Sequence, residues 1–233
     1  MREWIGWLGY WALRILLGAM LVSILLVALF RFVPLPGSMV MLERWAGARL
    51  AGEPFALHYR WTPWQSLSDE ARLAVIAAED QNFPNHFGFD FGQIRDAIQA
   101  WREGRTLRGA STISQQTAKN VFLWSDRSVL RKGLEVWFTF LIELIWPKQR
   151  ILEVYLNVAE WDRGVFGLDA AAEHYFGIRA SQVSADRAAR LAAVLPNPLE
   201  WSPLHPNAYV QGRIAWIRQQ MRQLGGVGYL QRL

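Results

Sequence analysis

The hydrophobic pattern separates one long apolar run near the N-terminus from a longer region of mixed polarity. Residues 11–30 read WALRILLGAMLVSILLVALF, with Arg14 as the only charge, and a helix of this length can cross a bilayer. Arg2 and Arg14 favour a cytoplasmic N-terminus, although Arg31 on the far side weakens that bias. A cleaved signal peptide is the alternative, but the run is longer than a usual signal sequence and no clear small-x-small site follows it. We expect a single membrane-spanning helix over residues 11–31.

After this run, apolar residues recur mainly at helical spacing. Ser68, followed by Asp69 and Glu70, predicts the start of a helix that runs through Glu79. Further helices are predicted over residues 39–50, 128–146, from 148 onward, 169–176 and 184–195, and in a last helix with one apolar stripe at Val210, Ile214, Ile217, Met221 and Leu224. The one strand signal is the alternation of Phe55, Leu57, Tyr59 and Trp61. The expected fold class is mainly α.

Composition and missing motifs narrow the chemistry. Apolar residues make up 52% of the 233 residues and charged residues 19%, which fits a globular domain with an appendage. The absence of cysteine excludes a disulfide scaffold, a thiolate zinc site and a cysteine nucleophile. The net charge of +5 favours a partner that carries phosphate or carboxylate groups. No nucleotide-binding glycine motif, no HExxH motif and no Ser-x-x-Lys with a later Lys-Thr-Gly is present.

A first polar constellation lies at the end of the helix that Ser68 begins. Residues 79–90 read EDQNFPNHFGFD, and Val75 and Ile76 share a helix face with Glu79. An apolar wall of this kind raises the pKa of a carboxyl group toward that of a working general base. The alternative is a solvated Glu-Asp pair at a helix end, with two core phenylalanines, Phe83 and Phe87.

A second constellation is rich in hydroxyl and amide groups. Residues 109–120 read GASTISQQTAKN, which combines a glycine, four hydroxyls, two glutamine amides and the ammonium of Lys119. Such a set of donors suits a pyrophosphate, which requires no rigid base-edge geometry. The alternative is the N-capped polar start of a helix.

A third constellation, Arg131-Lys132-Gly-Leu-Glu135, places two cations and one carboxylate on one helix face. A carboxylate flanked by two cations stays ionised and can help to hold a bound phosphate. The alternative is a surface ion pair that contributes a few tenths of a kcal/mol.

In their order and spacing, these segments resemble the peptidoglycan glycosyltransferase family, in particular its monofunctional, membrane-anchored biosynthetic branch in Gram-negative bacteria. The first motif of that family is matched by Glu79, Asp80, Phe83, His86 and Gly88. The second is matched by Gly109, Ser111, Thr112, Gln115, Gln116, Lys119 and Asn120, and the third by Arg131, Lys132 and Glu135. A fourth is matched by Lys148, Ile151, Leu152, Glu153, Tyr155, Leu156 and Asn157. The resemblance covers residues 67–224, and it departs from the family where Trp161-Asp162-Arg163 stands in place of an expected glycine before Gly164.

The resemblance implies a lysozyme-like glycosyltransferase domain that polymerises lipid II into β-1,4-linked glycan strands and releases undecaprenyl pyrophosphate. Glu79 would be the base that deprotonates the acceptor 4-hydroxyl, and attack on the donor would invert the anomeric carbon. Glu135 is the second catalytic residue implied, and the substrate and pyrophosphate would be bound by Ser111, Gln115, Lys119, Asn120, Arg131 and Lys132. The supporting motif residues would be Asp80, Phe83, His86, Gly109 and Thr112. No organic cofactor is expected, and Glu135 is the one candidate ligand for a divalent cation such as Mg or Mn.

The expected organisation places this domain outside the cytoplasm, on a single-pass anchor in the inner membrane. Its parts are a cytoplasmic N-terminus (1–10), a membrane helix (11–31), a linker segment (32–60), the glycosyltransferase domain (61–226) and a C-terminal tail (227–233). Expected partners are lipid II, the growing glycan chain and the membrane, with transpeptidases or division proteins as candidate protein partners and no nucleic acid. The rival interpretations are a lysozyme-like hydrolase or lytic transglycosylase, and a non-catalytic membrane-tethered scaffold. The hydrolase needs an acid but no pyrophosphate clamp.

Overall fold

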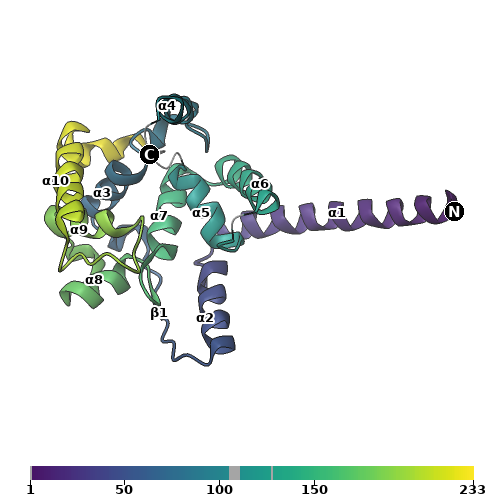
Figure 1. Cartoon of the computed structure of the whole chain (residues 1–233), viewed down its shortest axis with the longest axis horizontal. Coiled ribbons are helices and arrows are strands. Elements are labelled where there is room, and N and C mark those ends of the chain that lie inside the picture. The colour runs from purple at the N-terminus through teal and green to yellow at the C-terminus, as the bar shows by residue number, and fades with distance from the viewer. Residues whose placement is uncertain (1, 105–110, 127) are drawn as a thin grey trace.

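The structure, a computed structural model, describes residues 2–104, 111–126 and 128–233, and it is mainly helical, as the sequence predicts. Figure 1 shows one long helix projecting from a body built of the other elements. The α-helices are α1 (Arg2–Phe30), α2 (Met39–Ala51), α3 (Asp69–Glu79), α4 (Phe91–Arg102), α5 (Ile113–Phe122), α6 (Val129–Ile145), α7 (Lys148–Val158), α8 (Leu168–Phe176), α9 (Ala185–Val194) and α10 (Ala208–Gln223). Short 3₁₀ turns are η1 (Trp64–Ser66), η2 (Phe83–Asn85), η3 (Ala180–Gln182) and η4 (Gly226–Arg232), and the strands are β1 (His58–Tyr59), β2 (Glu160–Asp162) and β3 (Val165–Phe166).

The helix boundaries follow the capping signals in the sequence. The hydroxyl of Ser68 accepts a hydrogen bond from the Ala71 amide at the start of α3, and Ser128 caps α6 in the same way through the Arg131 amide. Helix α8 ends at Gly177, which adopts the left-handed conformation at φ +63°. These predicted boundaries are confirmed to within a residue.

The strand predicted around residues 55–61 is much shorter in the structure. Only His58 and Tyr59 form β1, which pairs in parallel with β3. The pairing ends at Tyr59 because its partner β3 ends at Phe166, and the next residue, Gly167, is the N-cap of α8. A two-residue partner cannot extend a longer strand.

The tight turn between β2 and β3 needs a glycine at one position. Gly164 has φ +78°, whereas Arg163 stays at negative φ. A Cβ atom built on Gly164 would lie 2.3 Å from the carbonyl oxygen of Ala56, so the chain before β1 also requires the absence of a side chain there. The residues at 161–163 that replace an expected glycine are therefore compatible with the hairpin.

Helix α3 lies in the centre of the core. Its residues from Ala71 to Ala77 are all buried, and the helix packs against α9, α10 and η4. On the other side of the body, α5 packs against α6 and α7. The end of α3 and the start of α5 meet between these two groups, which brings the predicted polar segments together.

Helix α1 is long and apolar enough over Gly9–Phe30 to serve as a single-pass membrane anchor. Its last turns are hydrogen-bonded to the body. The indole nitrogen of Trp137 donates to the Ser23 hydroxyl at 3.0 Å, and that of Trp146 donates to the Val27 carbonyl at 2.7 Å. The Arg150 guanidinium donates to the Phe30 carbonyl. The anchor is thus fixed to α6 and α7.

Candidate active site

Glu79 is the last residue of α3, and its carboxylate accepts hydrogen bonds from two other helices. Oε2 accepts from the side-chain amide of Gln116 on α5 at 2.9 Å, and Oε1 accepts from the guanidinium of Arg213 on α10 at 3.0 Å. Only 13% of the Glu79 side chain is exposed. The solvated helix-end pair considered from the sequence is therefore wrong for this residue.

Burial and its partners act in opposite directions on Glu79. Burial raises the pKa of Glu79 above its ordinary value, while the Gln116 hydrogen bond and the Arg213 charge lower it in part. Tyr155 extends the network, since its hydroxyl donates to Gln116 Oε1 at 3.2 Å, and burial raises the pKa of Tyr155, which keeps it a neutral donor. The result is a carboxylate more basic than an ordinary glutamate and held in position by donors alone.

Asp80, the residue after Glu79, fixes the turn at the end of α3. It is almost fully buried, its Oδ2 accepts a hydrogen bond from the Ile113 amide at 3.0 Å, and His86 Nε2 lies 2.9 Å from the same oxygen. Phe83 is fully buried beneath this turn, with the Lys148 ammonium 4.6 Å from its ring centre. These contacts tie the end of α3 to the start of α5.

The alternative interpretation of this constellation also placed Phe87 in the core, which is wrong. Its side chain is 51% exposed and lies edge-on to Phe140 on α6. Gly88, the next residue, brings the backbone close to α6. A Cβ on Gly88 would lie 2.7 Å from the Thr139 methyl group.

The hydroxyl-rich segment at the start of α5 is mostly used for folding. Thr112 caps α5 and donates to the Gly88 carbonyl at 2.7 Å, and the Gln115 side chain accepts from the Thr112 amide in a capping box. The hydroxyls of Ser114 and Thr117 bond to Glu143 and to the Ile113 carbonyl. Ser111 is exposed, and Gly109 lies outside the described residues.

The predicted interaction of two cations with Glu135 is present, and Glu135 is buried. Arg131 donates to Glu135 Oε2 at 2.5 Å and Lys132 donates to Oε1. Glu135 is only 3% exposed, so the weak surface ion pair considered from the sequence does not describe it. Lys132 itself is 48% exposed and can reach a ligand.

Lys119 joins these residues to form a cationic cluster, defined here as Lys119, Arg131, Lys132 and Glu135. Burial lowers the pKa of Lys119, the Arg131 and Lys132 charges lower it further, and Glu135 and Glu43 oppose them. Arg131 and Lys132 therefore bond to the buried carboxylate of Glu135, and Lys119 lies close enough to feel the charge of all three. Gln116 and Lys119 are three residues apart on α5, so one turn of this helix connects Glu79 to the cluster. Asn120, which follows Lys119, is partly exposed.

A divalent cation does not fit the donors around Glu135. Both carboxylate oxygens already accept from Arg131 and Lys132, and a hard cation prefers several oxygen ligands without competing positive charge. Among the described residues, no group of three or more histidine, aspartate or glutamate side chains could hold a metal ion.

Three residues of the Glu79 network were not assigned a role from the sequence. Gln116 and Tyr155 lie inside matched motifs, but spacing alone could not distinguish Gln116, which contacts Glu79, from Gln115, which caps α5. Arg213 had no motif signal, because it is one charged position beside the apolar stripe of α10. Only the packing of α10 against α3 brings it to Glu79. Glu153 and Asn157 instead bond to the backbone of Trp64 and Thr62 and have structural roles.

The chain is similar to a family model and to several curated proteins. The family model described as Transglycosylase matches residues 49–222. A protein of Chromohalobacter salexigens named biosynthetic peptidoglycan transglycosylase is 64% identical over 225 residues, which cover 95% of this chain and 96% of that protein. Proteins of the same name from Pseudomonas fluorescens SBW25 and Pseudomonas putida W619 are 61% and 58% identical, over 89% and 91% of this chain and 87% and 89% of theirs.

Proposed function

The chain belongs to the Transglycosylase family, and from this premise we propose that Glu79 and the cationic cluster are the two halves of its active site. The protein is a peptidoglycan glycosyltransferase of cell-wall synthesis that polymerises lipid II and releases undecaprenyl pyrophosphate. One observation carries the assignment of the site. The mostly buried carboxylate of Glu79 accepts a hydrogen bond from Gln116, and Gln116 lies one turn of α5 from Lys119 of the cationic cluster.

In the proposed reaction, Glu79 takes the proton from the 4-hydroxyl of the acceptor sugar as that oxygen attacks the donor anomeric carbon. The new glycosidic bond forms as the bond to the lipid pyrophosphate breaks, and the configuration is inverted. The raised pKa of Glu79 makes it a stronger base than a solvent-exposed glutamate. Arg213 and Gln116 hold the carboxylate in place and favour its ionised form.

The leaving pyrophosphate carries its charge away without a proton, so it needs cations rather than an acid. Lys119, Arg131 and Lys132 supply that stabilisation in this proposal, with Glu135 holding Arg131 and Lys132 in position. Ser111, which precedes the start of α5, and Asn120, in its last turn, are the further proposed binding residues. A hydrolase requires an acid beside the scissile bond but no pyrophosphate clamp, so the cationic cluster favours the transferase.

We also propose that the domain lies in the periplasm on an inner-membrane anchor. The end of α1 that bonds to α6 and α7 is the C-terminal one, which emerges on the side opposite the N-terminal residues Arg2 and Glu3. Lipid II and its product are both lipid-linked, so an anchored enzyme searches for them in two dimensions. Transpeptidases or division proteins are the proposed protein partners.

The test is polymerisation of labelled lipid II by the full chain in detergent. We expect glycan strands from the wild type and a fall in turnover of about 10²-fold or more for Glu79→Gln, the range of a lost general base. Glu70→Gln, at the other end of α3, is the matched control and should retain activity. Release of fragments from finished peptidoglycan without use of lipid II would contradict the proposal, as would full turnover by Glu79→Gln.

A further inference from the structure

The residues that follow α10 fold back onto α3. Gly225 and Gly226 have φ +95° and +67°, and two successive left-handed residues reverse the chain direction. Residues 226–232 then form η4, which packs against α3, and Figure 1 shows this yellow segment crossing from α10 toward α3. The family model ends at residue 222, so this segment lies outside the matched region.

One side chain of η4 reaches the loop that follows Glu79. The Tyr229 hydroxyl donates to the backbone carbonyl of Gln81 at 2.7 Å, and Tyr229 is only 7% exposed. Burial raises the pKa of Tyr229, so the hydroxyl remains a neutral donor at physiological pH. The Arg232 guanidinium lies 5.0 Å from the Tyr229 ring centre and covers the ring.

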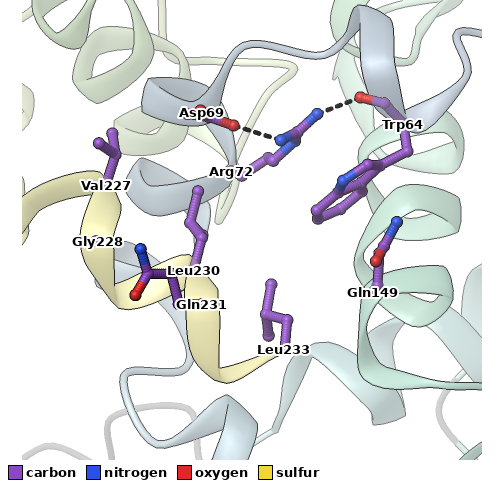
Figure 2. A pocket seen from close by; sticks show the side chains of 9 residues that line it. All are labelled: Trp64, Asp69, Arg72, Gln149, Val227, Gly228, Leu230, Gln231 and Leu233. Carbon is purple, nitrogen blue, oxygen red and sulfur yellow. Dashed lines mark hydrogen bonds and ion pairs between the residues drawn. The ribbon is translucent and has the colours of Figure 1, made fainter.

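Other residues of η4 lie near the N-terminal end of α3. Figure 2 shows Leu230, Gln231 and Leu233 facing Trp64 and Gln149 across an open pocket of about 350 Å³. Above this pocket the Arg72 guanidinium bonds to Asp69 and to the Trp64 carbonyl. Residues from both ends of the segment, Val227 and Leu233, therefore line this pocket beside the start of α3, while Tyr229 bonds to the Gln81 turn at the other end of the helix.

Helix α10 and η4 together hold both sides of Glu79. Arg213 on α10 contacts the carboxylate itself, and Gln220 on α10 accepts a hydrogen bond from the Gln81 side chain at 3.2 Å. Tyr229 then fixes the Gln81 carbonyl. Because Gln81 is two residues from Glu79, a shift of this turn moves the carboxylate relative to Arg213 and Gln116.

We infer that Tyr229 is a positioning residue for the proposed base, and that residues 226–233 act as a latch on the turn after Glu79. This inference rests on the proposed role of Glu79. Tyr229 touches no substrate in this assignment and acts through the backbone of Gln81. Loss of its hydroxyl loosens the turn, weakens the two hydrogen bonds to Glu79 and misplaces the base.

The test compares Tyr229→Phe with Tyr209→Phe in the full chain. Tyr229→Phe keeps the buried ring and removes one hydroxyl, while Tyr209 is 63% exposed at the start of α10 and its ring lies against Trp201. For Tyr229→Phe we expect kcat on lipid II to fall about three- to tenfold, the scale of one hydrogen bond, with KM within about twofold. The acid limb of the kcat profile should move to higher pH, because Arg213 and Gln116 then lower the pKa of Glu79 less.

A second readout does not depend on turnover. Hydrogen–deuterium exchange in a peptide covering residues 80–85 should speed up in Tyr229→Phe and stay at the wild-type rate in Tyr209→Phe. The inference is overturned if Tyr229→Phe matches Tyr209→Phe in kcat, pH profile and exchange, or if its kcat falls only in proportion to a loss of folded protein. The failure of the proposed function looks different, since wild type itself would then make no polymer or Glu79→Gln would be fully active.

Discussion

At the residue scale, the surroundings of Glu79 decide whether its carboxyl group acts as a base or as an acid. An isolated buried carboxyl group tends to be neutral and to act as an acid. Here hydrogen-bond donors from two different helices favour the charged form. They cancel part of the rise in the pKa of Glu79 that burial causes. This balance gives a carboxyl group with a raised proton affinity whose charged form is held by two donors, and the charged form is the state that proton transfer from a hydroxyl nucleophile requires.

Arg213→Gln tests this balance directly. Arg213 lowers the pKa of Glu79, so its loss raises that pKa further, and a base with a higher pKa is protonated over a wider acidic range. The acid limb of kcat for lipid II polymerisation should therefore move to higher pH, with the smallest loss of turnover at alkaline pH. The matched control is Arg222→Gln, an exposed position in the last turn of α10, which should leave the profile unchanged. An unshifted acid limb in Arg213→Gln would show that Arg213 does not tune the base.

At the element scale, the sequence predicted most of the helices because their signals are local. Ser68, Ser128 and Gly177 set the ends of their helices by hydrogen bonds or left-handed geometry within a few residues. The strand predicted over residues 55–61 is longer than the observed β1, because the length of β1 depends on β3, more than a hundred residues away. Local patterns describe an element well when its limits are fixed by its own neighbours.

In the candidate active site, too, contacts between neighbours on one helix could be predicted from the sequence, whereas contacts between helices could not. Arg131, Lys132 and Glu135 are neighbours on one helix, so their contact follows from spacing. The partner of Glu79 on α5 is Gln116, while Gln115 points back into the cap of its own helix. The choice between adjacent glutamines depends on how α5 is rotated against α3, and the contact of Arg213 depends on the packing of α10. Neither contact can be predicted from the spacing of residues along the chain.

Gly164→Ala provides a test of the hairpin that anchors β1. The alanine methyl would lie 2.3 Å from the Ala56 carbonyl, at a φ of +78° that side chains rarely adopt. We expect a loss of about 2 kcal/mol or more in the free energy of unfolding, measured by denaturant or thermal melting. Gly47→Ala is the control, because Gly47 lies inside α2 with no atom within 4 Å of the added methyl group. That variant should gain up to about 1 kcal/mol from helix propensity, and an equal response of the two variants would contradict the steric argument.

At the scale of the whole molecule, the anchor and the body form one connected structure. The side chains of Trp137, Trp146 and Arg150 bond to the last turns of α1, so the domain cannot rotate freely about a linker at this point. The orientation of α1 in the membrane therefore decides which face of the membrane the proposed site serves. Both the substrate and the polymer it builds are lipid-linked, and a fixed orientation keeps the site at the surface where they lie.

The orientation can be read with single cysteines, because the natural chain contains none. A cysteine at Gln219, an exposed position on α10, should react in intact spheroplasts with a maleimide that cannot cross membranes. A cysteine at position 3, in place of Glu3, should react only after the cells are lysed, since the proposal places the N-terminus in the cytoplasm. The cysteine-free wild type reports background labelling, and a permeant maleimide confirms that both thiols are reactive. The opposite labelling pattern would place the domain in the cytoplasm, whereas labelling of both positions in intact spheroplasts would mean that α1 does not span the membrane.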